Sequence, residues 1–192
     1  MKRFPFEKLR VREASIGSSL CFNPYSKYEP KTRWSIGIGI HPIKLGNEAA
    51  IPEYEDAVDS PIILDELELN IDDWKKLADE FNFSDQQNGS FYVSHVHNPV
   101  DALRLQLSAK GGAEFDVHAN IKVFFEFEGA GYADEEVELR FPATYTGFGF
   151  SVPTWNEPKK VRLPKKWKVP STDERWSEQE ILDFVAPHVD LS

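Results

Sequence analysis

The chain has 192 residues, of which 41% are hydrophobic and 28% are charged, and its formal net charge is −10. These proportions exclude wholesale disorder, collagen-like repeats and a bundle of membrane helices. A chain of this size buries about 70% of its unfolded surface, so residues 1–192 are expected to form a single domain without a disulfide or a structural metal.

Alternating apolar residues predict strands in the first part of the chain. Phe4 to Val11 is short and contains Pro5, which favours an edge strand. From Trp34 to Ile40, large apolar residues alternate with serine and glycine, so a strand with one buried face is predicted there. Ile62 to Leu69 predicts another strand, which leads directly into a helix.

That helix is predicted over residues 71–82. Asn70 can act as its N-cap, and Asp72 and Asp73 would lie in its first turn, where carboxylates favour the helix dipole. An apolar stripe at helical spacing completes the pattern. Its members are Ile71, Trp74, Leu77, Ala78 and Phe81.

A β-meander is predicted from residue 91 onward. Phe91 to His97 is expected to be a strand that closes at Asn98-Pro99, and Phe115 to Phe127 is expected to be one long strand. Between them, a three-residue loop over residues 110–112 would pair Leu107 with Phe115 and keep the apolar side chains on one face.

Prolines mark the expected end of this sheet. Pro142 is predicted to break the strand that contains Val137, and residues 144–152 to form a separate strand. Residues 153–170 contain four prolines among six lysines and arginines, and they predict an extended crossing segment. A closing helix is predicted over residues 172–185, within a tail of residues 171–192. Its cap is either Ser171 or Ser177, and Ser177 has the capping-box spacing to Glu180.

Taken together, these elements predict an α+β fold. Its main part is a mostly antiparallel, strongly bent β-sheet or sandwich of about seven or eight strands. One mid-chain helix at 71–82 and one C-terminal helix at 172–185 complete it.

Charge is unevenly distributed along the chain. Residues 1–44 carry a net charge of +6, residues 45–144 carry −16, and residues 145–192 carry zero. One interpretation is internal, with basic arms lying across an acidic sheet. The other is external, with the acidic middle docking a basic protein partner. Nucleic acid is disfavoured by the negative total charge.

The sequence also favours a cytoplasmic location. Met1 to Lys8 is charged but no apolar run follows it, so a secretory signal is not expected. No stretch of about 18 apolar residues is present, so no membrane partner is expected. Cys21 is the one cysteine, which excludes an intramolecular disulfide.

Three histidines form the first candidate site. His95 and His97 are two positions apart on a predicted strand, so both would point to one face, and His118 lies on a neighbouring long strand. Such a set can hold a transition metal if the side chains converge. The alternative is that all three are ordinary strand residues.

Glycines and aromatics form the second candidate site. Glycine inside a strand often marks close approach by a ligand or another backbone, so two glycine-bearing strands could floor a ligand groove. The alternative is that aromatic rings of the core pack over the glycines. The candidate groove residues are Trp34, Gly37, Gly39, Tyr145, Gly147, Phe148 and Gly149.

No phosphate-binding glycine loop, nucleophile elbow or zinc-protease motif is present in the sequence. We therefore expect a non-catalytic binding protein, specifically an immunity-like or regulatory partner of a basic protein. The alternatives are a metal-dependent enzyme that uses the His-x-His strand and a small-ligand binder that uses the aromatic and glycine groove. No cofactor is expected apart from the transition metal of the first alternative.

Overall fold

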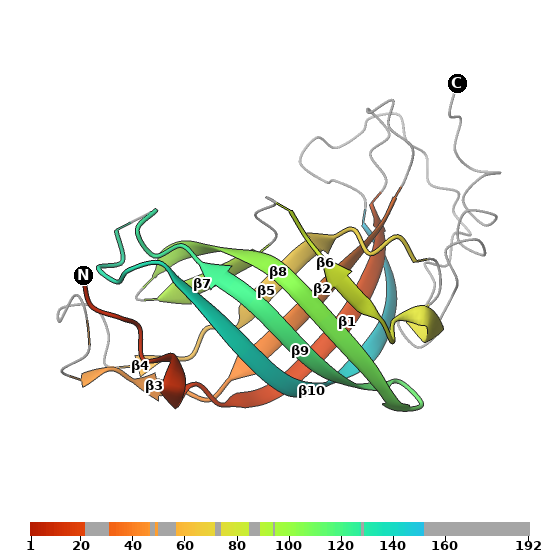
Figure 1. Ribbon diagram of the computed structural model, residues 1–192, viewed down its shortest axis with the longest axis horizontal. Coiled ribbons are helices and arrows are strands. Elements are labelled where there is room, and N and C mark those ends of the chain that lie inside the picture. The colour runs from red at the N-terminus through yellow and green to blue at the C-terminus, as the bar shows by residue number, and fades with distance from the viewer. Residues whose placement is uncertain are drawn as a thin grey trace, which may run out of the picture.

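The computed structural model describes residues 1–21, 31–46, 49, 57–71, 74–84, 89–93, 95–127 and 129–151. Seven strands close into a β-barrel in the order β8-β7-β5-β2-β1-β10-β9, with β9 pairing back to β8 (Figure 1). All neighbours are antiparallel except β1 and β10, which are parallel. The barrel strands are β1 Val11–Cys21, β2 Lys31–Ile40, β5 Ile62–Leu67, β7 Gly89–Val93, β8 Val96–Gly111, β9 Glu114–Val123 and β10 Glu135–Ser151.

Shorter elements flank the barrel. At one end lie the 3-10 turn η1, Phe6–Lys8, and a two-stranded sheet of β3, Ile43–Lys44, and β4, Ala57–Val58 (Figure 1). At the other end, the 3-10 turn η3, Trp74–Lys76, precedes β6, Glu80–Asn82, which pairs with β8 outside the ring. No helix of the described residues is long and apolar enough to cross a membrane.

The predicted α+β class is wrong, because the described residues contain no helix of seven or more residues. The predicted sandwich is also wrong, because the strands form one closed ring rather than two packed sheets. The predicted crossing segment at 153–170, the tail at 171–192 and the helix at 172–185 lie outside the described residues.

The mid-chain helix predicted at 71–82 is replaced by η3 and β6. Asn70 has φ 53°, which is left-handed backbone, whereas an N-cap is extended. Phe81 pairs with Leu105 of β8, so the sheet uses this residue as a strand position. Leu77 is fully buried and Ala78 is exposed, so tertiary contacts override the helical stripe.

Two prolines predicted to end strands lie inside strands instead. β8 continues through Asn98-Pro99, and the Asn98 side-chain amide donates to the carbonyls of Phe91 and Val96, each at 2.9 Å. β10 continues through Pro142, so the two strands predicted on either side of this proline are one.

The predicted register between β8 and β9 is also wrong. Leu107 pairs with Val117 rather than with Phe115. The turn lies between the paired residues Gly111 and Glu114, and an irregularity between Ala109 and Gly111 absorbs one residue. Because the shift is even, the apolar side chains still share the inner face.

Because apolar and polar residues alternate along the strands, apolar side chains fill the barrel interior, as expected for a small barrel. Val117, Ile121 and Val123 of β9 are buried, which confirms the predicted inner face of this strand. Among the described residues, the buried polar side chains are those of Ser18 and Asn98. The interior is therefore a packed core.

Aromatic side chains close each end of the core. At one end, the ring of Phe4 lies 5.3 Å from Phe125, 5.4 Å from Tyr132 and 5.5 Å from Phe91, measured between centroids. This cluster is called the phenylalanine plug below. At the other end, Trp74 of η3 stacks on Tyr145 at 5.3 Å.

Candidate functional site

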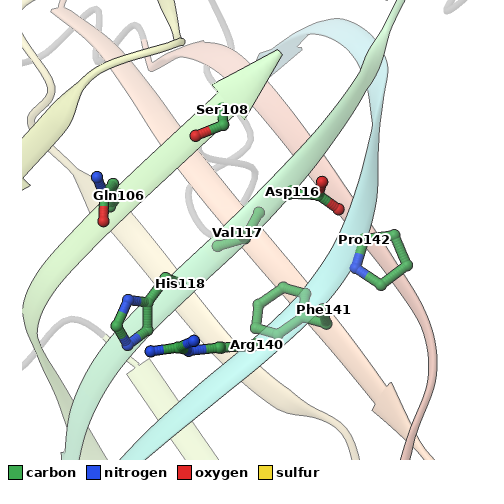
Figure 2. Close-up of a pocket in the computed structure, with 8 residues that line it drawn as sticks. All are labelled: Gln106, Ser108, Asp116, Val117, His118, Arg140, Phe141 and Pro142. Atoms are coloured by element: carbon green, nitrogen blue, oxygen red, sulfur yellow. The ribbon is translucent and has the colours of Figure 1, made fainter. Parts of the chain in front are cut away.

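A shallow groove runs over the outer face of β8, β9 and β10, and we call it the outer groove. Its volume is about 510 Å³. Figure 2 shows His118 of β9 beside Arg140 of β10, with Gln106 of β8 on the other side of His118. The lining residues are Gln106, Ser108, Asp116, Val117, His118, Arg140, Phe141 and Pro142.

Polar contacts hold part of this groove in place. The His118 Nε2 lies 3.3 Å from the Glu138 Oε2, and the Lys110 ammonium lies 3.2 Å from the Asp116 carboxylate. The Arg140 guanidinium is exposed and forms no hydrogen bond or ion pair with any described residue. Arg140 is therefore available to an incoming group.

A second groove follows from the way β10 changes neighbours. Pairing between β1 and β10 begins at Ser15 and Thr144, so the first half of β10 pairs with β9 alone. We call the interval between residues 6–14 and residues 136–142 the seam. Figure 1 shows β10 diverging from β1 toward the end of the barrel that carries η1.

The seam is a groove with a volume of about 510 Å³. Its floor is apolar and its rim is charged, and it shares Arg140, Phe141 and Pro142 with the outer groove. The lining residues are Phe6, Glu7, Leu9, Arg10, Val11, Val137, Glu138, Leu139, Arg140, Phe141 and Pro142.

The backbone of β10 presents a free edge to the seam. The Tyr145 N–H donates to the Ala113 carbonyl at 2.8 Å, on the β9 side. Since backbone groups alternate in direction along a strand, the odd-numbered residues before Tyr145 also face β9. The N–H and C=O groups of Glu136, Glu138 and Arg140 therefore face the seam, where no hydrogen bond joins them to another described residue.

Carboxylates gather where the seam opens. Asp134, Glu136 and Glu138 are exposed, and Glu135 is half-buried and lies 3.9 Å from the Arg3 guanidinium. Over all described residues, fourteen lysines and arginines face sixteen aspartates and glutamates. The net charge of the described residues is thus close to zero, and within them this acidic run is a local concentration of negative charge.

The structure does not bring the three candidate metal ligands together. His95 lies in the turn between β7 and β8 with φ 65°, while His97 follows on β8 and packs against Tyr92, with ring centroids 5.2 Å apart. His118 is opposite Gln106, nine residues along β8 from His97, which is about 30 Å. Within the described ranges, no group of three His, Cys, Asp or Glu side chains could hold a metal ion.

The candidate groove residues are divided between the two faces of the barrel wall. Trp34 and Tyr145 do come together, with ring centroids 6.0 Å apart, but both are buried inside. Gly37 and Gly39 lie on the outer face, where added Cβ atoms would contact Ser15 and Glu13 of β1 at 3.3 and 3.1 Å. The glycines therefore do not floor a groove for these aromatics.

The remaining candidates lie along the second half of β10. Gly147 pairs with Gly17 at a register irregularity between β1 and β10, and it has φ 119°, which favours glycine. Phe148 is buried and pairs with Ser18, and Gly149 pairs with Ser19. Their positions indicate a role in closing the barrel.

Sequence reasoning selected His118 but missed Arg140, Gln106 and the seam. Arg140 is a polar member of an alternating strand, which gives no local signal of a site. Pro142 did carry a signal, since proline inside a strand is found at free edges.

Comparison with protein-family models, curated proteins and solved structures finds no match for this chain. Function therefore has to be inferred from the surface of the barrel itself.

Proposed function

We propose that this chain is a non-catalytic binding protein whose acidic run, residues 134–138, docks a basic partner protein. An immunity-like or regulatory role would fit such docking. The single observation that carries this proposal is the placement of these carboxylates beside the seam, among described residues whose net charge is close to zero. The cytoplasm is the proposed compartment, because Cys21 leaves the chain without an internal disulfide.

The filled interior supports an outer binding surface. The core cluster extends from Phe4 and Phe125 at one end to Trp34 and Tyr145 at the other, and apolar side chains occupy the space where a larger barrel holds a ligand. The two described grooves open on the outside of the wall.

Charge supplies the expected specificity for a basic partner. Glu136 forms no ion pair with a described residue, and the ion pair of Glu138 among them is with His118. Exposed carboxylates raise the association rate of a cationic partner. Salt at 0.1 M limits the range of this attraction to about 10 Å.

The test uses a fluorescent octalysine peptide and anisotropy at low and high salt. The triple variant Asp134→Asn, Glu136→Gln, Glu138→Gln should bind it about tenfold more weakly at low salt, since each exposed contact contributes about 0–1 kcal/mol. The matched control removes three charges from the opposite side of the ring: Asp59→Asn, Asp65→Asn, Glu66→Gln. Equal weakening by both variants would refute a local acidic docking site.

A further inference from the structure

We propose that the seam binds an extended segment of the basic partner, which adds as a strand between β10 and β1. This inference rests on the proposed function and specifies how the partner is recognised. The occupant is a stretch of alternating apolar and basic residues, inserted antiparallel to both flanking strands.

Backbone N–H and C=O groups on both sides of the seam are oriented to pair with such a strand. Glu136, Glu138 and Arg140 direct unpaired N–H and C=O groups into it from β10. On the other side, the His41 N–H donates to the Arg10 carbonyl at 2.9 Å, so Arg10 faces β2 and the backbone of Val11 faces the seam. A free sheet edge of this kind is the template for strand addition by a peptide.

The length and lining of the seam suit a short strand. Residues 136–142 span about 20 Å, enough for a strand of about six residues. One face of the incoming strand would meet the apolar floor formed by Leu9, Val137 and Leu139, and the other would face solvent. This geometry calls for alternating side chains in the ligand.

The rim charges favour lysine or arginine on the outer face of that strand. Glu136 and Glu138 project outward from β10, and Glu7 lies across the seam. The Arg10 guanidinium donates to the backbone carbonyls of Glu7 and Leu9 at 2.8 and 2.7 Å, so this cation already has hydrogen-bond partners in its own segment. Arg140 is the one opposing cation on the described β10 edge.

Pro142 shows how to test the role of the backbone. It lies at an even position of β10, where its missing N–H removes nothing from the β9 ladder. Glu138→Pro should likewise delete one seam-facing donor and leave the β9 pairing intact. Glu138→Gln removes the same charge and keeps the donor, so it is the matched control.

The probe is a fluorescent octapeptide of alternating valine and lysine, and its binding is measured by anisotropy. Glu138→Pro should weaken binding at least tenfold more than Glu138→Gln, because the peptide loses a hydrogen bond and keeps an unpaired carbonyl. Equal effects of the two variants would overturn strand addition, as would no binding of this probe by the native chain. The octalysine assay reports separately on the proposed acidic docking.

Substitutions of Arg140 also separate the effect of the backbone donor from the effect of charge. Here the charge removed is positive, so its loss should favour a basic peptide. Removing this cation makes the rim more acidic, so Arg140→Gln should bind the valine–lysine peptide as well as the native chain or better. Arg140→Pro removes the same charge and one seam-facing N–H, so it should bind at least tenfold more weakly. If Arg140→Pro instead matched Arg140→Gln, charge alone would explain binding and strand addition would be refuted.

A modified peptide keeps the test independent of protein folding. A valine–lysine octapeptide N-methylated at every second residue loses the donors of one edge. Methylation on either edge should abolish binding to the native chain, because the inserted strand pairs on both sides. Undiminished binding of both methylated peptides would overturn the proposal even if a proline variant fails to fold.

Discussion

The two halves of β10 share one alternating pattern but differ in their neighbours. From Thr144 onward, β10 pairs with β1, and its ladder with β9 ends at Thr144 and Glu114. From Glu135 to Ala143 it pairs with β9 alone, and the phenylalanine plug closes the core nearby. The comparison shows that a barrel can be closed by hydrogen bonds at one end and by packing at the other.

The difference arises from the N-terminal segment. Residues 4–9 run beside the first half of β10 but fold into the 3-10 turn η1, with the Lys8 N–H donating to the Pro5 carbonyl at 3.0 Å. A turn at this point cannot extend β1 along β10. Phe4, only 2% exposed, fills the end of the barrel in place of a paired strand.

The largest expected effect on stability comes from removing the Phe4 side chain. Phe4→Ala should lower the free energy of unfolding by about 3–5 kcal/mol, because it empties the centre of the plug. Urea denaturation measures the loss, and Met1→Ala, at an 80% exposed position, is the control. A loss below 1 kcal/mol would show that the seam end does not depend on this packing.

Proline substitutions in the open half of β10 should give the next largest effect. The Val137 N–H faces β9, so Val137→Pro should cost about 3 kcal/mol through a lost ladder bond. The Glu138 N–H faces the seam, so Glu138→Pro should cost less than about 1 kcal/mol. Thermal unfolding compares the two variants, and similar losses would contradict the assigned directions of the backbone groups.

A smaller effect is expected on β5, whose first residues are paired on both edges. Burial, and secondarily the charge of Glu66, raises the pKa of the Asp65 carboxyl. A raised folded pKa makes the ionised form unfavourable at neutral pH, and this cost disappears as the pH falls below the ordinary carboxyl range. Asp65→Asn should therefore raise Tm slightly at pH 7 and leave it unchanged at pH 3.

Asp59→Asn, on the exposed segment before β5, controls for loss of one charge. A lower Tm for Asp65→Asn at pH 7, or an equal gain at both pH values, would contradict the effect of burial on this carboxyl.

The strands could be predicted from sequence wherever large apolar residues alternate, as from Trp34 to Ile40 and from Val117 to Val123. Closure of the barrel could not, because it depends on Ser15 pairing with Thr144, two residues far apart in the chain. The helix predicted at 71–82 failed because Leu77 and Phe81 suit a turn and a strand equally well once β8 is adjacent.

The candidate site, too, could be predicted from the sequence only in part. His118 could be selected by residue type, but its neighbour Arg140 is defined only by the register between β9 and β10. The seam depends on which side of β10 is left unpaired, and no local pattern encodes that. Pro142 and Pro5 are the residues whose chemistry points to a free edge.

Amide hydrogen exchange tests the difference between the two halves of β10 most directly. In the open half, protection should alternate: the Val137 and Leu139 amides should exchange slowly, and those of Glu136, Glu138 and Arg140 quickly. In the half next to β1, the amide of Thr144 should be slow, because this even-numbered residue faces β1 rather than the seam. Uniformly slow exchange from Glu136 to Arg140 would show that the seam edge is already paired and would contradict this account.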